Sequence, residues 1–151
     1  MFLVILFASL TCKPYSNNIC SALEFQLCDS CKCNYNCWPD FGKTDYNLND
    51  DQILSFLYSL GEECKNNVEF SEWSNEVLFN IVLANPEIFL KVMDSYSTNI
   101  ELDWILKELE DPISDVIIKE IYEKINNVNE YDSTKKLIIK SLQIALDRNQ
   151  Y

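Results

Sequence analysis

Apolar residues recur every three to four positions from Leu48 onward, which is the period of amphipathic helices. The first such stretch begins with a start signal, because Asn49 is an expected N-cap and Gln52 stands where it completes a capping box. The stretch stays periodic to Leu60 and then meets Gly61, one of only two glycines in the chain. We therefore predict a helix that begins after Asn49 and ends at Gly61.

The later helices are also marked by capping residues and prolines. Ser71 is the expected cap of a second helix. Asn85–Pro86 and Asp111–Pro112 each place a proline directly after a capping residue, which predicts the start of a third and a fifth helix. The fourth and sixth helices are expected to begin at Asn99 and near Asp132. The fifth is expected to bury Ile113, Val116, Ile117, Ile121 and Ile125.

No strand or hairpin pattern interrupts these stretches, so the sequence predicts an all-α fold of about six helices. Connections as short as Asn-Pro favour neighbouring helices that turn back as antiparallel hairpins. Such hairpins recur at intervals of about 30 to 40 residues, so the set resembles a short HEAT- or armadillo-type array, with an irregular bundle as the alternative. The predicted organisation is a signal peptide at 1–11, a cysteine-rich irregular segment at 12–46 and a helical domain at 47–151.

The 151 residues carry 12 basic and 24 acidic side chains, a net charge of −12. From Tyr46 to Tyr151 the count is nine basic against twenty acidic residues, so the acidity belongs mainly to the predicted helical domain. A surface this negative repels phosphate backbones and anionic lipids, which disfavours nucleic-acid binding and electrostatic membrane docking. A basic protein is the permitted kind of partner. The alternative is that the acidity serves only solubility.

The first eleven residues, MFLVILFASLT, form an almost wholly apolar run. The run is too short to span a bilayer, which takes about 20 apolar residues, but it has the length of the hydrophobic part of a signal peptide. It departs from the usual signal-peptide pattern in one respect, because no basic residue precedes Phe2. We therefore expect an export signal at 1–11.

The run Ser9-Leu10-Thr11-Cys12 resembles a bacterial lipoprotein cleavage site, although Ser9 and Thr11 are not the residues most usual there. The resemblance implies cleavage before Cys12, lipid attachment at Cys12 and membrane anchoring at the cell envelope through that lipid alone. The alternatives are a signal peptide that is cut elsewhere, which would give a soluble secreted protein, and a cytoplasmic protein that keeps its hydrophobic N-terminus.

Seven cysteines are an odd number for a fully oxidised exported protein. If Cys12 carries the lipid, six remain, which can close as three disulfides: Cys20, Cys28, Cys31, Cys33, Cys37 and Cys64. Disulfides suit a segment that has no room for a core of its own. Because Cys64 follows the first helix, a bridge to it would attach the cysteine-rich segment to the helical domain.

Four of these cysteines also allow a metal site, as the alternative chemistry in a reducing compartment. Cys28, Cys31, Cys33 and Cys37 fall within ten residues and could bind zinc or an iron-sulfur cluster. Their spacing differs from the usual pair of Cys-x2-Cys units, which stand more than ten residues apart. Disulfides are therefore the expected chemistry, and no cofactor is expected.

The composition also excludes most familiar catalytic sites. The absence of histidine excludes Ser-His-acid triads and HExxH zinc sites, and two glycines are too few for Walker or Rossmann loops. The acidic residues at 101, 108, 110, 111 and 115 are interpreted as a solvated face, and Trp73 and Trp104 as core residues. We therefore expect no enzyme but an exported, lipid-anchored binding module, for example an acidic inhibitor or immunity-type partner of a basic protein. The alternative is a cytosolic, cysteine-liganded metal-binding interaction protein.

Overall fold

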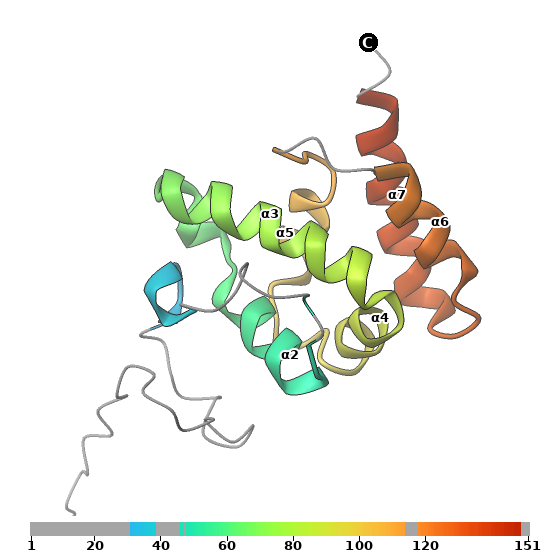
Figure 1. Ribbon diagram of the computed structural model, residues 1–151, viewed down its shortest axis with the longest axis horizontal. Helices are drawn as coiled ribbons and strands as arrows, with labels where there is room; N and C mark the ends of the chain where they lie inside the picture. Colours follow the sequence, from blue (N-terminus) through green and yellow to red (C-terminus); the bar gives the residue numbers. More distant parts are fainter. Residues whose placement is uncertain (1–30, 39–45, 47, 114–117, 149–151) are drawn as a thin grey trace, which may run out of the picture.

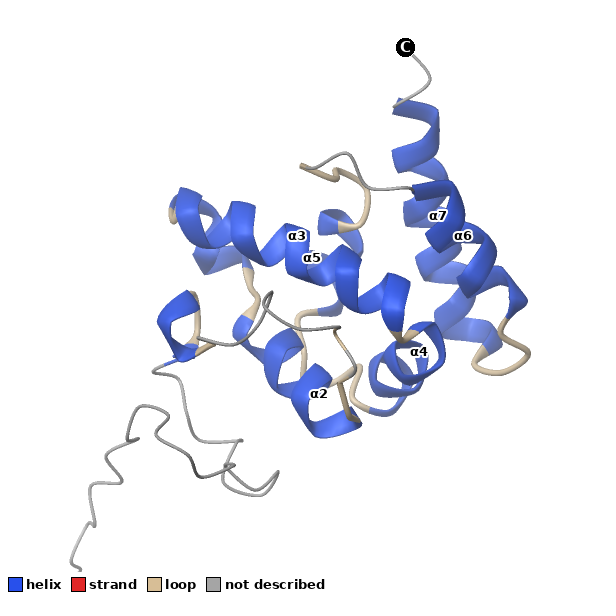
Figure 2. Cartoon of the chain, in the orientation of Figure 1, coloured by secondary structure: helices blue, strands red, loops and turns tan. Residues whose placement is uncertain are grey.

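The computed structural model describes residues 31–38, 46, 48–113 and 118–148. This described part contains six α-helices, two short 3-10 helices and no strand, which confirms the all-α fold (Figures 1 and 2). In chain order the elements are η2 Tyr35–Cys37, α2 Asp50–Ser59, η3 Glu62–Asn66, α3 Val68–Ala84, α4 Pro86–Ser95, α5 Leu102–Glu108, α6 Ile118–Asn127 and α7 Asp132–Arg148.

Helix α4 lies at the centre of the helical domain, because it packs against α2, α3, α6 and α7. Helices α6 and α7 lie side by side at one end of the molecule, and α3 crosses one face toward α4 (Figure 1). Helix α5 contacts α7 although α6 stands between them in the sequence. In a linear array each unit would contact only its neighbours. The arrangement is therefore the irregular bundle, the second of the two expected forms.

The core is built from the apolar faces that the periodicity predicts. Four phenylalanine side chains are at most 1% exposed: Phe56, Phe70, Phe79 and Phe89. In α6, Ile121 and Ile125 stand four positions apart and are both fully buried. Burial of one such side chain stabilises the fold by about 1.5–3 kcal/mol, so these faces supply the main driving force for the bundle.

The start of α2 confirms the predicted capping box. The Asn49 side chain accepts a hydrogen bond from the Gln52 backbone N–H at 3.0 Å, and the Gln52 side chain accepts one from the Asn49 N–H at 3.0 Å. The helix ends at Ser59, with Leu60 as its C-cap. Gly61 follows in an extended conformation, with φ 178°, and leads into η3. The helix thus ends where expected, but without a left-handed glycine.

The start of α3 corrects the prediction that Ser71 is its cap. The helix begins at Val68, and Asn67 is the cap, because its side-chain oxygen accepts a hydrogen bond from the Phe70 N–H at 3.2 Å. Ser71 lies one turn inside the helix, and its hydroxyl donates to the Cys64 carbonyl at 3.3 Å. The earlier start has a packing reason, since it buries Phe70.

The starts of α4 and α7 agree with the prediction, while that of α5 differs. Pro86 is the first residue of α4, although Asn85 makes no side-chain capping bond and instead donates to the Tyr46 carbonyl. Helix α5 begins at Leu102 and not at Asn99. The preceding turn is closed by a hydrogen bond from the Ile100 N–H to the Tyr96 carbonyl at 3.2 Å, and Ile100 is buried there.

The predicted fifth helix is wrong in its first residues. Asp111, Pro112 and Ile113 are not helical, and α6 begins at Ile118 in the described part of the chain. Ile113, expected in the core, is 57% exposed, whereas Ile121 and Ile125 are buried as predicted. The expected core residues Val116 and Ile117 lie outside the described residues.

Candidate functional site

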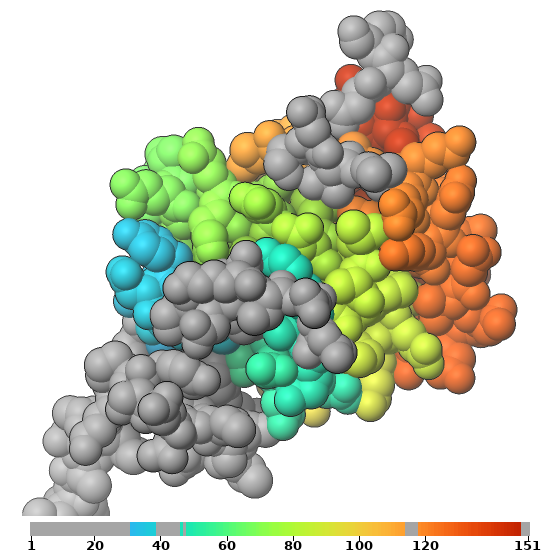
Figure 3. Space-filling view, viewed as in Figure 1, coloured from blue at the N-terminus to red at the C-terminus, as the bar shows by residue number. Residues whose placement is uncertain are grey.

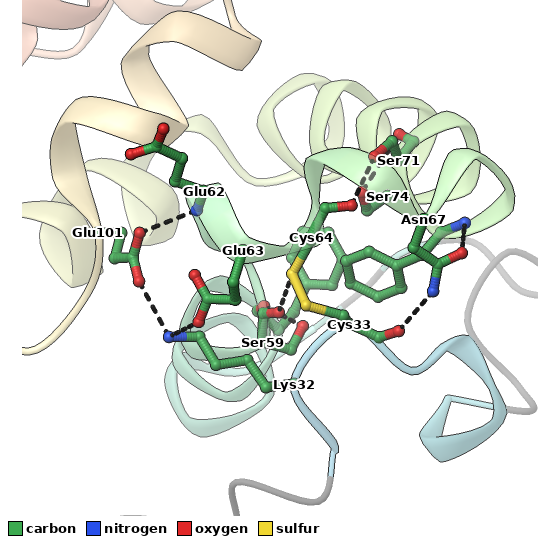
Figure 4. Close-up of a disulfide and its surroundings, with 12 residues drawn as sticks. Lys32, Cys33, Ser59, Glu62, Glu63, Cys64, Asn67, Ser71, Ser74 and Glu101 are labelled. Atoms are coloured by element: carbon green, nitrogen blue, oxygen red, sulfur yellow. Dashed lines mark hydrogen bonds and ion pairs between the residues drawn. A yellow bond between two sulfur atoms is a disulfide. The ribbon is translucent and has the colours of Figure 1, made fainter.

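The cysteine-rich segment is attached to the helical domain by a disulfide between Cys33 and Cys64, with the sulfur atoms 2.01 Å apart (Figure 4). Cys64 lies in η3, just after α2, and is 2% exposed. Hydrogen bonds accompany the bridge: the Cys33 N–H donates to the Ser59 carbonyl at 3.2 Å, and the Asn67 amide donates to the Cys33 carbonyl at 3.0 Å. This is the attachment through Cys64 that the sequence predicted.

A charged cluster lies next to this bridge (Figure 4). The Lys32 ammonium contacts the Glu63 carboxylate at 2.5 Å and the Glu101 carboxylate at 2.9 Å. Glu101 also accepts a hydrogen bond from the Glu62 backbone N–H at 3.0 Å. Burial acts to lower the pKa of Lys32, but its hydrogen bonds to the two carboxylates outweigh this and raise the pKa. The hydrogen bond from Lys32 lowers the pKa of Glu63.

Some of the other predicted cysteine sites lie within the described residues, and some lie outside them. Cys31 and Cys37 form a second disulfide, so four of the six candidate cysteines pair in the described residues. Three of the four alternative metal ligands, at 31, 33 and 37, are thereby held in disulfides. No group of three or more potential metal ligands lies together in the part of the chain that the structure describes. The lipid-attachment candidate Cys12 and the cysteines at 20 and 28 lie outside it.

Acidic side chains are concentrated in one part of the helical domain. Residues 48–113, which form α2 to α5, contain three lysines and fourteen acidic residues, a balance of −11. Residues 118–148, which form α6 and α7, contain six basic and five acidic residues, a balance of +1. A charged partner would therefore be attracted or repelled mainly by α2–α5.

An open groove of about 530 Å³ lies against α3, and we call it the α3 groove. Among the described residues it is lined by Glu69, Glu72, Trp73 and Glu76 of α3 and by Ile113, which follows α5. The three glutamates are exposed and stand at i, i+3 and i+7, so they share one face of the helix. Figure 3 shows α3 at the molecular surface, in green to lime. The groove thus combines three carboxylates with two large apolar side chains.

Trp73 belongs both to the core and to the α3 groove. Its ring lies 6.0 Å from that of Phe56 and 5.8 Å from that of Phe70, measured between centroids. The side chain remains partly exposed where it lines the groove. Trp73 therefore packs against the core, as predicted, and its remaining exposed part faces the groove. Because Phe56 and Phe70 are buried, they fix the position of the indole that the groove presents.

The three groove glutamates have no cation beside them in the described part of the chain. None takes part in the ion pairs there, and α3 itself contains no lysine or arginine. By contrast, Glu62, Glu63 and Glu101 are each paired with a lysine. Carboxylates without cations attract positive charge most strongly, so the α3 groove is the candidate site for a basic ligand.

A buried asparagine of α3 binds the backbone of the groove residue Ile113. Asn75, 1% exposed, accepts a hydrogen bond from the Ile113 N–H at 3.0 Å. Its amide donates to the Glu108 carboxylate at 3.0 Å and to the carbonyls of Glu108 and Asp111 at 3.3 Å. These bonds join the non-helical residues 111–113 to α3. They also place Ile113 beside α3.

The position of Glu108 beside Asn75 changes the pKa of its carboxyl group. Burial raises its pKa, while the hydrogen bond from Asn75 acts in the opposite direction and is outweighed. Glu108 is half-buried and Glu101 pairs with Lys32, so neither belongs to a freely solvated face, which corrects that interpretation for these two residues; Asp115 lies outside the described residues. Sequence reasoning missed Glu69, Glu72 and Glu76. Their signal was available, since they are three acids around Trp73 in a helix without basic residues.

No helix within the described residues is long and apolar enough to cross a membrane. Features of the described residues that bear on function include the two disulfides, the charged cluster at Lys32 and the α3 groove. No family model, curated protein or solved structure shows significant similarity to this chain, so the chemistry of these residues is what indicates its function.

Proposed function

We propose that this protein is an exported, lipid-anchored binding module that uses the acidic surface of α2–α5 to hold a basic protein, without catalysis. The specific role within this class is that of an inhibitor or immunity-type protein, which covers a basic partner. The observation that carries the proposal is the charge asymmetry, −11 over residues 48–113 against +1 over residues 118–148.

The asymmetry matters because solubility alone does not require it. Acidic residues spread over the whole surface would keep the chain soluble equally well. Acidity confined to one part of the surface also orients an approaching basic protein and accelerates its association. The three glutamates of the α3 groove add carboxylates that no lysine of the described chain neutralises.

Export and membrane anchoring are supported by two different observations. Disulfides persist mainly in oxidising compartments, and four cysteines pair at disulfide distance here. Anchoring rests on the resemblance of the sequence around Cys12 to a lipoprotein cleavage site. The test is the intact mass of the protein from membrane and soluble fractions, before and after reduction and thiol labelling. A membrane species that begins at Cys12 with added acyl mass supports the proposal, and a soluble species that retains Met1 with free thiols overturns it.

Binding is tested with the full, oxidised chain and a fluorescent oligolysine peptide about twelve residues long, at about 0.15 M salt, where the Debye length is about 8 Å. The decisive variant carries Glu69→Gln, Glu72→Gln and Glu76→Gln together, and we call it the groove variant. We expect its affinity for the peptide to fall about tenfold, since three close charge pairs are lost.

The matched control removes the same charge away from the groove, through Glu87→Gln, Asp103→Asn and Glu123→Gln, all at exposed positions. We expect this control to weaken binding less than threefold, because only the long-range field changes. Equal losses in the two variants would show that net charge alone attracts the peptide. That result, or the absence of binding to the unmodified protein, would overturn the proposal.

A further inference from the structure

The apolar residues of the α3 groove restrict its partner further than charge alone does. Trp73 and Ile113 both line it, and Ile113 is one of the most exposed large apolar side chains of the described chain, at 57%. An exposed isoleucine gains stability when a partner covers it, at about 25 cal/mol per Å² of buried apolar area. The groove therefore offers an apolar contact between its carboxylates.

The carboxylates exclude several kinds of occupant. A phosphorylated or acidic segment would meet Glu69, Glu72 and Glu76 without any compensating cation. A wholly apolar ligand would remove water from these carboxylates and leave them without partners, which is strongly unfavourable. A cationic segment meets neither obstacle, and one that also carries an apolar group gains contact with Trp73 and Ile113.

We infer that the α3 groove receives a segment of the basic partner in which lysine or arginine residues flank one large aliphatic side chain. The aliphatic side chain lies between Trp73 and Ile113, and the flanking cations meet the carboxylates of Glu69, Glu72 and Glu76. The volume of about 530 Å³ is within the range of ligand sites and suits a short segment of chain. This inference rests on the proposed function, because it names the part of the basic protein that binds.

A second copy of this chain is the competing occupant. On α7, Leu137 is 42% exposed, and Lys136 and Lys140 beside it are exposed and take part in none of the ion pairs of the described chain. The surface around Leu137 thus combines one exposed aliphatic side chain with two cations, which is the chemistry that the groove is inferred to receive. Two copies, however, each carry a net charge of −12 and repel each other, so a separate basic protein fits the groove better.

The test uses two lysine peptides of equal length and charge, one with a central leucine and one with a central serine. Binding of each to the full, oxidised chain is measured by fluorescence anisotropy. We expect the leucine peptide to bind about fivefold more tightly, since partial burial of leucine contributes about 1 kcal/mol. We expect Ile113→Ser to abolish this preference, so that the leucine and serine peptides bind this variant with equal affinity.

The matched control is Leu137→Ser, which removes another exposed apolar side chain, from α7. We expect it to keep the preference for leucine, and circular dichroism should show both serine variants folded. An undiminished preference in Ile113→Ser, or no preference in the unmodified protein, overturns the inference. If the serine peptide still binds the groove variant less tightly than it binds the matched control Glu87→Gln, Asp103→Asn, Glu123→Gln, the proposed function survives that failure.

Sedimentation of the unmodified protein tests the competing occupant. We expect a monomer at micromolar concentration. Self-association that both Leu137→Ser and the groove variant abolish would show that α7 of a second copy occupies the groove, and would overturn the inference. Failure of the proposed function is distinguishable, because then the serine peptide binds the groove variant and the matched control Glu87→Gln, Asp103→Asn, Glu123→Gln equally.

Discussion

Asn75 in α3 accepts a hydrogen bond from the backbone N–H of Ile113 at 3.0 Å, across 38 positions of sequence. The same side chain donates to Glu108 and to the Asp111 carbonyl. One buried amide therefore joins α3 to the segment that follows α5, which contains the exposed Ile113. The apolar wall of the α3 groove depends on this contact, so the groove is a product of tertiary structure.

Replacing this amide should destabilise the protein. We expect Asn75→Ala to lower the free energy of unfolding by about 2–3 kcal/mol, because buried backbone groups of residues 108–113 lose their partner. Urea denaturation measures this change, and hydrogen exchange should accelerate at Ile113. Asn80→Ala is the matched control: Asn80 makes one weak hydrogen bond, to the Tyr46 hydroxyl at 3.4 Å, and should cost less than about 1 kcal/mol. A similar loss in both variants would show that Asn75 has no special role.

The two disulfides should contribute unequally to stability. The Cys33–Cys64 bridge joins residues 31 positions apart, and Cys31–Cys37 joins residues 6 positions apart. By loop-closure entropy, replacing both cysteines of the first pair with serine should cost about 3–4 kcal/mol, and of the second about 2 kcal/mol. Urea denaturation of the two double variants shows which disulfide contributes more to the free energy of unfolding. The reverse order would contradict the prediction that the Cys64 bridge is the principal attachment of the cysteine-rich segment.

Glu108 should make stability depend on pH. Its folded pKa is raised by burial, so between the ordinary glutamate pKa and this higher value the folded state binds more protons than the unfolded state. Stability must therefore fall as pH rises through that window. We expect Glu108→Gln, which keeps an acceptor for Asn75, to have the higher melting temperature at pH 7 and to lose this advantage at acid pH. Glu123→Gln controls for the removed charge, and a constant difference at all pH values would contradict the assignment.

Features encoded by neighbouring residues were predictable from the sequence. The capping box of Asn49 and Gln52 and the proline start of α4 at Pro86 depend only on residues a few positions apart. The attachment through Cys64 was predictable because a cysteine of an exported protein is expected to form a disulfide in an oxidising compartment. The position of Cys33 as its partner was not, since six cysteines allow fifteen pairings.

Features that depend on distant residues were not predictable. Asp111–Pro112 has the local pattern of a helix start, yet residues 111–113 are not helical and are hydrogen-bonded to the distant Asn75. Ser71 is a good cap by its residue type, yet an earlier start at Val68 buries Phe70. In both cases burial or a buried hydrogen bond outweighs a local preference, which is worth only about 1 kcal/mol. The juxtaposition of Trp73 and Ile113 therefore could not be read from periodicity.

Salt should slow association with a basic ligand if the acidic surface steers it. Raising ionic strength from 0.1 to 1 M shortens the Debye length from about 10 to about 3 Å, which screens the carboxylates of α2–α5 from an approaching cation. Stopped-flow measurements with the oligolysine peptide should therefore show a falling association rate. The variant Glu69→Gln, Glu72→Gln, Glu76→Gln should show a weaker salt dependence, and the matched control that keeps these residues should show nearly the full one. An association rate that is indifferent to salt would mean that the charge of α2–α5 does not guide binding.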